Sequence, residues 1–135
     1  MYEVVVTYQN DKNADTLLCE SKPSAEFTGK FVILNCGKGQ QFTFNVDTIL
    51  KAAIKYPLPD RIPSLKYAVD IHYNTSSDDV ELLFSPSTVD VDVKGEIVLV
   101  KEGDNVIRII NGSLLRSVKV SAYTEENVGS STPTA

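Results

Sequence analysis

The chain has 135 residues, of which 42% are hydrophobic and 23% charged, a composition typical of one ordinary globular domain and not of a disordered or fibrous protein. Its formal net charge is -5 and its Lys and Arg residues are scattered, so the clustered cations that bind a nucleic-acid backbone are missing. No apolar run approaches the ~20 residues that span a bilayer, and the first residues do not resemble a secretion signal, so we expect cytoplasmic synthesis without membrane insertion.

The N-terminal part of the chain alternates apolar and polar residues with a period of two. Residues 27–34 continue a pattern that begins in residues 2–8, where one face would carry Tyr2, Val4, Val6 and Tyr8. Such alternation is typical of β-strands with one face in a core.

A Gly37-Lys38-Gly39 sequence between two apolar runs raises the question of a phosphate-binding loop. That loop requires Gly-x-x-x-x-Gly-Lys-Ser/Thr followed directly by a helix. Here Val32 stands where the first Gly is needed, and Gly39 stands in place of the hydroxyl residue. We therefore interpret the sequence as a hairpin turn, with positive φ at both glycines and Lys38 in solvent.

Residues 46–56 break the period of two. Their apolar side chains recur at helical spacing, at Val46, Ile49, Leu50, Ala53 and Ile54. This spacing predicts one short amphipathic α-helix, capped by Asn45 or Asp47 and ended by Pro57.

Three prolines within residues 57–63 predict a stiff crossover between two sheets or two halves of one sheet. Short alternating runs follow, separated by turns rich in Gly, Asn and Ser, and in residues 66–74 one face would carry Tyr67, Val69, Ile71 and Tyr73. The pattern predicts a mostly β fold, an antiparallel sandwich or barrel. We assign residues 1–126 to a single domain and residues 127–135 to a polar tail.

Residues 98–113, VLVKEGDNVIRIINGS, resemble the final hairpin of carbohydrate-binding β-sandwich modules, in which a strand, a Gly-x-Asn turn and an alternating Ile strand recur. The resemblance covers about an eighth of the chain and implies a sandwich. Those modules generally bind sugar through exposed aromatic residues, whereas this chain has no Trp.

Two cysteines and one histidine are too few for a zinc site with finger-like spacing. We expect Cys19 and Cys36 to be half-buried free thiols, while a disulfide between them depends on geometry that the sequence does not give. No cofactor is predicted.

Four aspartates raise the question of a divalent-cation site: Asp78, Asp79, Asp90 and Asp92. Calcium requires about 6–8 oxygen ligands from a tight loop. Because Asp90 and Asp92 alternate with valines, we interpret them as the solvated face of a strand, where charges also deter edge pairing.

His72 is the single histidine, and it shares a strand face with Asp70. With a serine, the two would form part of a catalytic triad, but the chain has no Gly-x-Ser-x-Gly elbow. A surface histidine is the better interpretation. We predict no catalytic, cofactor-binding or metal-binding residue, and a protein that is not an enzyme.

We therefore expect a structural or assembly protein that contacts copies of itself or a larger scaffold, for instance a virion component such as a capsid decoration or tail protein. The first alternative is a carbohydrate-binding module, with a groove lined by Tyr2, Tyr8, Tyr67 and Tyr73. The second is a single-stranded nucleic-acid-binding barrel, which requires one groove to collect Lys30, Lys38, Lys51, Lys55 and Arg61.

Overall fold

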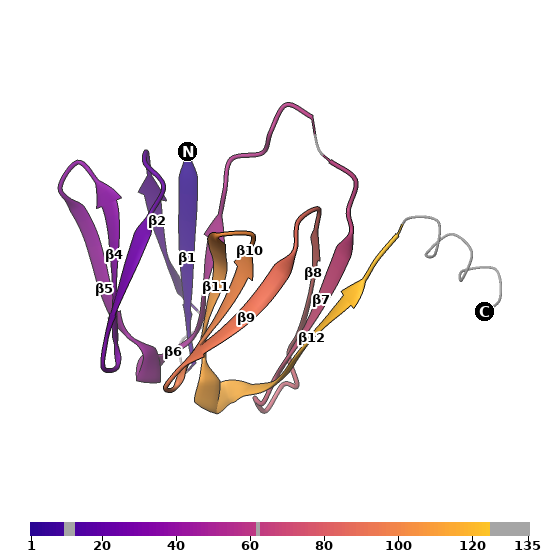
Figure 1. Ribbon diagram of the computed structural model, residues 1–135. Coiled ribbons are helices and arrows are strands. Elements are labelled where there is room, and N and C mark those ends of the chain that lie inside the picture. Colours follow the sequence, from indigo (N-terminus) through magenta and orange to yellow (C-terminus); the bar gives the residue numbers. More distant parts are fainter. Residues whose placement is uncertain (10–12, 62, 125–135) are drawn as a thin grey trace.

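The computed structural model describes residues 1–9, 13–61 and 63–124, which form three antiparallel sheets (Figure 1). The first six strands are β1 (Tyr2–Tyr8), β2 (Ala14–Cys19), β3 (Ser24–Thr28), β4 (Phe31–Gly37), β5 (Gln40–Asn45) and β6 (Ile49–Lys55). The next six are β7 (Tyr67–Tyr73), β8 (Val80–Ser85), β9 (Val89–Lys94), β10 (Ile97–Glu102), β11 (Asn105–Asn111) and β12 (Leu115–Ala122). The mostly β fold predicted from the sequence is confirmed, while the predicted tail, residues 127–135, lies outside the described residues.

The three sheets form three layers. A central sheet has the strand order β2-β1-β6-β11-β10-β9, and the outer sheets are β3-β4-β5 and β12-β7-β8. Successive residues of β10 point to opposite faces of the central sheet. Leu99 joins a core shared with β4, and Val98 joins a second core shared with β7. One outer sheet therefore covers each face.

The predicted α-helix at residues 46–56 was wrong. A 3-10 turn, η1 (Val46–Thr48), is followed by β6, which pairs with β1 on one side and with β11 on the other. Both faces of β6 are covered, since Ile54 joins the first core and Leu50 packs on the second. A strand buried on both faces loses its alternation of apolar and polar residues, and its apolar residues matched helical spacing.

The free thiols expected at Cys19 and Cys36 were also wrong, because the two residues form a disulfide. Cys19 ends β2 and Cys36 lies on β4, and both are buried. These strands belong to facing sheets, so the fold brings together two positions 17 residues apart. The sequence spacing alone carries no sign of that facing arrangement.

The chain consists of two equivalent repeats, repeat 1 (β1–β6) and repeat 2 (β7–β12). The order β2-β1-β6 in repeat 1 matches β8-β7-β12 in repeat 2, and β3-β4-β5 matches β9-β10-β11. The sequences YEVVVTY of β1 and YAVDIHY of β7 agree at their inward-facing positions. The crossover predicted at the prolines therefore links the two halves.

Backbone hydrogen bonds recur at the same separation in both repeats. The Val46 N–H donates to the Lys30 carbonyl at 2.8 Å, and the Gly112 N–H donates to the Glu96 carbonyl at 2.7 Å. Donor and acceptor each lie 66 residues further along the chain. From β2 onward, therefore, a position in repeat 1 corresponds to the position 66 residues later. For β1 and β7 the separation is 65.

The caps of the two 3-10 turns are equivalent as well. Asn45 Oδ1 accepts a hydrogen bond from the Asp47 N–H before η1, and Asn111 Oδ1 accepts one from the Ser113 N–H before η2 (Gly112–Leu114). Figure 1 shows both turns at the same end of the molecule. The duplication thus extends to individual side chains.

The repeats meet where β6 pairs with β11, and we call this pairing the joint. Its register aligns Arg108 with Ala53, Ile109 with Ala52 and Ile110 with Lys51. Beside the joint, repeat 2 also closes the end of the repeat 1 sandwich. Its outward-facing side chains there are fully buried in the first core and are Ile97, Leu99 and Ile109.

Candidate functional site

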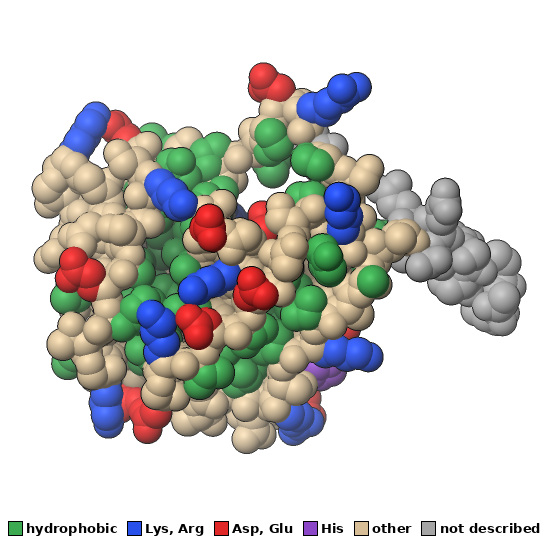
Figure 2. Space-filling view, viewed as in Figure 1, with side chains coloured by type: hydrophobic (Ala, Val, Ile, Leu, Met, Phe, Trp, Pro, Cys, Tyr) green, Lys and Arg blue, Asp and Glu red, His purple; other side chains and the backbone are tan. Residues whose placement is uncertain are grey.

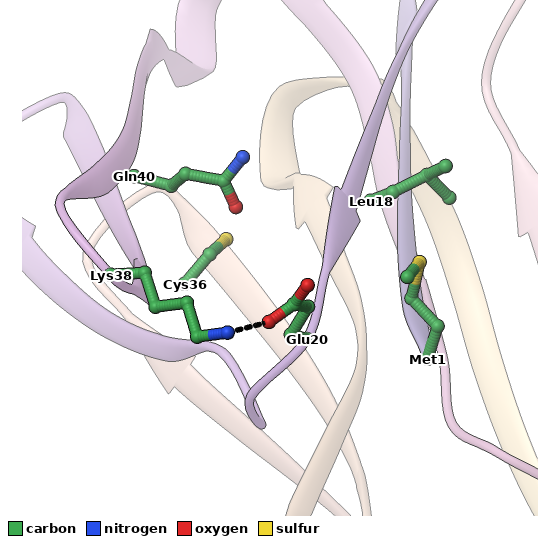
Figure 3. Close-up of a pocket in the computed structure, with 6 residues that line it drawn as sticks. All are labelled: Met1, Leu18, Glu20, Cys36, Lys38 and Gln40. Atoms are coloured by element: carbon green, nitrogen blue, oxygen red, sulfur yellow. Dashed lines mark hydrogen bonds and ion pairs between the residues drawn. The ribbon is translucent and has the colours of Figure 1, made fainter.

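The Gly37-Lys38-Gly39 segment forms the turn between β4 and β5, as the hairpin interpretation requires. Its φ angles are +76°, +51° and +77°. A surface pocket of about 320 Å³ lies beside it (Figure 3), lined by Met1, Leu18, Glu20, Cys36, Lys38 and Gln40. Lys38 is exposed but forms an ion pair with Glu20. The turn therefore presents a neutralised ion pair rather than a cation for phosphate.

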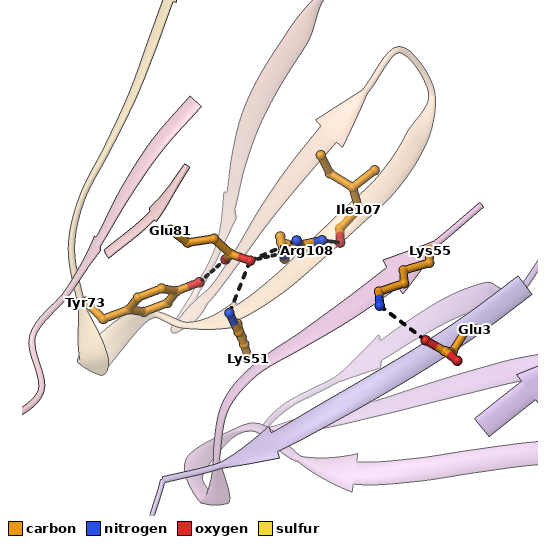
Figure 4. Close-up of polar contacts among 7 residues, drawn as sticks. All are labelled: Glu3, Lys51, Lys55, Tyr73, Glu81, Ile107 and Arg108. Atoms are coloured by element: carbon orange, nitrogen blue, oxygen red, sulfur yellow. Dashed lines mark hydrogen bonds and ion pairs between the residues drawn. The ribbon is translucent and has the colours of Figure 1, made fainter. Parts of the chain in front are cut away.

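A half-buried ionic cluster lies beside the joint (Figure 4). Arg108 Nε and Nη2 donate to Glu81 Oε2 at 3.1 and 2.8 Å, and Lys51 Nζ lies 3.2 Å from the same oxygen. The Tyr73 hydroxyl donates to Glu81 Oε1 at 2.8 Å. Lys51 belongs to repeat 1 and the other three residues to repeat 2, so the cluster ties the repeats together.

Protonation in this cluster is fixed by its contacts. Burial favours the neutral form of Glu81, but the hydrogen bonds and charge of Arg108, together with Lys51 and Tyr73, outweigh it and hold the pKa of Glu81 below its ordinary value. Burial also raises the pKa of Tyr73, and the charge of Glu81 adds to that rise. Near neutral pH the carboxylate stays charged and the phenol neutral, so the cluster has a structural role.

The structure does not gather the four aspartates into one site. Asp78 and Asp79 lie in the loop before β8, whereas Asp90 and Asp92 lie on β9. Asp78 pairs with Arg116 at 3.4 Å and Asp92 with Lys101 at 3.2 Å. Among the described residues, no group of three or more His, Cys, Asp and Glu side chains could hold a metal ion.

His72 and Asp70 lie on the outward face of the sheet β12-β7-β8, opposite to the side chains that enter the second core. The register places Ser117 of β12 beside His72 and Lys119 beside Asp70. A Lys next to Asp70 offers that carboxylate a partner other than the imidazole. The face is therefore a mixed polar surface.

The cations of the nucleic-acid alternative are dispersed among carboxylates. The ion pairs are Lys30 with Asp47, Lys38 with Glu20, Lys51 with Glu81 and Lys55 with Glu3. Arg61 lies on the exposed crossover. Four of these five cations thus already face an acidic partner.

The tyrosines of the carbohydrate alternative pack against the two cores. Tyr73 is buried, while Tyr2 and Tyr8 pack on the first core and Tyr67 on the second. Tyr2 also meets Tyr56 edge to face, with 5.6 Å between the ring centroids. These rings act mainly as core side chains.

Exposed apolar side chains gather on strands of the two outer sheets and on β9. On β8 they are Val80, Leu82 and Phe84, and on β9 they are Val91 and Val93. Phe31 of β4 and Val120 of β12 are also exposed. On the face shown in Figure 2, apolar side chains lie between adjoining basic and acidic ones.

Sequence reasoning missed the ionic cluster because it assigned Lys51 to the polar face of a helix. A signal was available in the repeat. The Tyr8 hydroxyl donates to Asp15 at 2.6 Å, as the Tyr73 hydroxyl donates to Glu81 at 2.8 Å. Comparing the two halves of the sequence would have paired these residues.

Comparisons with known proteins give no relative: no family model, no curated protein and no solved structure matches the chain. Within the described part of the chain, no helix has the length and apolar character to cross a membrane. The function is therefore inferred from the geometry of the chain itself.

Proposed function

We propose that the protein is a non-enzymatic structural protein that acts through protein–protein contacts, with copies of itself or within a larger assembly. A capsid decoration or tail protein is a role of this kind. The observation that carries the proposal is the gathering of exposed apolar side chains on strands. Val93 is 65% exposed, Val80 59% and Leu82 52%.

Apolar side chains grouped on an exposed strand favour contact with another protein, because contact removes their surface from water. Here they lie near sheet edges. β8, β9 and β12 are each the last strand of a sheet, and such strands have backbone N–H and C=O groups available for pairing. Apolar area and hydrogen-bonding capacity thus coincide, as strand-mediated assembly requires.

Light scattering of the purified chain over a wide concentration range, followed by pull-down from its native source, tests the proposal. We expect either a mass above that of the monomer or a specifically retained partner. Val93→Asp should weaken that contact, because it places a charge in the apolar set. Thr16→Asp, on the exposed face of β2, adds the same charge elsewhere and serves as the control. A chain that stays monomeric at high concentration and retains no partner would contradict the proposal.

A further inference from the structure

We propose that copies of this chain join head to tail, with β12 of one chain adding to β5 of the next and reproducing between chains the joint that β6 and β11 form within one chain. The partner is thus a second copy of the same chain. This inference rests on the proposed function, and it specifies the contact through which that function would operate.

The first step is that each chain carries an open copy of both strands of the joint. β12 is the counterpart of β6, and β5 is the counterpart of β11. β6 and β11 pair on both sides, whereas β12 ends the sheet β12-β7-β8 and β5 ends the sheet β3-β4-β5. The edge of β12 on one chain and the edge of β5 on another are therefore complementary by descent from one pairing.

The register of the joint gives the register between chains. Within the chain, Ile109 aligns with Ala52. The positions 66 residues earlier and later, respectively, are Thr43 and Val118. The neighbouring pairs follow in the same way, so the pairs expected between chains are Phe42 with Lys119, Thr43 with Val118 and Phe44 with Ser117.

The apolar surfaces beside the two edges also match. Within the chain, Ile97, Leu99 and Ile109 close the end of repeat 1 next to Ile54. The corresponding outward side chains of repeat 1 are Phe31, Ile33 and Thr43. The open end of repeat 2 carries Val91, Val93 and Val120, which correspond to Ala25, Phe27 and Ile54.

Exposure shows that these positions await a cover. Ile54 is 3% exposed, whereas Val120 in the same position of repeat 2 is 37% exposed. Ile97 is 2% exposed, whereas Phe31 in the same position of repeat 1 is 47% exposed. Seating Phe31 of one chain against Val120 of another would bury both sets of side chains as the joint does.

An asparagine at each joint supplies the same hydrogen bond. Asn111 Nδ2 donates across the joint to the Ile49 carbonyl at 3.1 Å while its Oδ1 caps η2. Asn45 makes the corresponding cap of η1. Its amide nitrogen would donate to the Leu115 carbonyl of the next chain, since Leu115 corresponds to Ile49.

The charges of the joint are retained with one exchange. Arg108, aligned with Ala53, supplies a cation to Glu81. Between chains the aligned pair is Phe42 with Lys119, so the cation comes from the opposite strand. The carboxylate that corresponds to Glu81 is Asp15. Lys119 of one chain would thus replace Arg108 as the partner of the carboxylate.

Such a contact is heterologous, because a β12 edge meets a β5 edge and leaves one edge of each kind open. Heterologous contacts build rings when the rotation closes and filaments when it does not. Thr43 replaces Ile109 and Arg116 replaces Leu50, so the contact between chains is more polar than the joint. We therefore expect association that depends on concentration.

Disulfide trapping tests the register directly. Aligned residues in an antiparallel pair have Cα atoms about 4.5–5.5 Å apart, which suits a disulfide. The native cysteines are bonded to each other and do not compete. An oxidised equimolar mixture of Thr43→Cys and Val118→Cys chains should give covalent dimers, and the double variant should give a ladder of oligomers. Replacing Val118→Cys by Lys119→Cys, which faces the other side of β12, should lower the yield roughly tenfold.

The outcomes separate this geometry from the proposed function. Oligomers by light scattering without a Thr43→Cys to Val118→Cys cross-link, or Thr43→Cys chains that dimerise among themselves equally well, would overturn the head-to-tail contact but leave the assembly function standing. A chain that is monomeric at every concentration would overturn it too, and the pull-down would then decide the function. Hydrogen exchange of the unmodified chain provides an independent measurement, since protection should rise with concentration at β5 and β12 and not at β6.

Discussion

Asn111 joins the two repeats at the scale of a single residue, since its side chain both caps η2 and donates to the Ile49 carbonyl of β6. We expect Asn111→Ala to lower the free energy of unfolding by about 2–3 kcal/mol, because a cap is lost and a buried carbonyl loses its donor. Urea denaturation measures this loss. Asn45→Ala, studied at low concentration, removes only a cap and should cost about 1 kcal/mol. Equal losses in the two variants would contradict the role given to Asn111.

Glu81 makes stability depend on pH. Its pKa is lowered in the folded chain, so its stabilisation is complete above the pKa of the unfolded state, about 4.3, and is lost as pH falls toward the lower folded value. Glu81→Gln should cost ~3 kcal/mol near pH 7, because it leaves Arg108 and Lys51 without a carboxylate, and should flatten the fall in stability below pH 5. Urea denaturation across this range gives both quantities.

The control for Glu81→Gln is Asp15→Asn in the corresponding position of repeat 1. Asp15 is exposed and accepts a hydrogen bond from Tyr8. We expect a small loss of stability and an unchanged pH dependence. A steep acid dependence that survives in Glu81→Gln would assign it to other carboxylates.

At the scale of elements, strands with one polar face could be predicted from the sequence, and β7 shows why. Its inward residues Val69 and Ile71 alternate with Asp70 and His72, so burial and sequence have the same period. β6 could not be predicted, because its two neighbours and two covers remove the polar face. A pattern of single residues does not reveal how many sheets surround a strand.

The disulfide ties β2 to β4, and it belongs to repeat 1. The corresponding positions of repeat 2 are Ser85 and Glu102. Cross-linking residues 17 apart restricts the unfolded chain and should stabilise the fold by about 3 kcal/mol. We expect a reducing agent to shift the urea midpoint of the natural chain downward. The variant with both Cys19→Ser and Cys36→Ser should show that lower midpoint with or without reductant, and a midpoint indifferent to reductant in the natural chain would contradict the stabilising role.

At the scale of the whole molecule, the two repeats share a core and should unfold together. Leu99 of repeat 2 is buried in the core of repeat 1, so Leu99→Ala should cost about 3 kcal/mol while leaving a single transition. Ile33 occupies the corresponding position of repeat 1 on an outward face and is half-buried. Ile33→Ala should therefore cost much less in dilute solution. Calorimetry checks both the loss and the single transition, and two separate transitions would show independent repeats.

The duplication was legible in the sequence only in part. Tyr residues two strands' width apart in β1 and β7, and the caps at Asn45 and Asn111, recur at fixed separation. Most other pairs differ, as Ala53 differs from Lys119, because one copy is covered and the other exposed. The candidate contact surfaces could be found only once the fold showed which copy of each strand lacks a cover.

The recurrence of one joint in two settings has a consequence for symmetry. If the contact between chains follows the joint, every sandwich in an assembly has nearly the same surroundings, although only alternate contacts are enforced by the crossover at residues 56–66. A closed ring would then show approximate rotational symmetry of twice its number of chains. A chain permuted to begin at Tyr67 would enclose the contact between β12 and β5 and leave that between β6 and β11 to assembly, exchanging the covalent and the dissociable contacts without altering the shape of the ring.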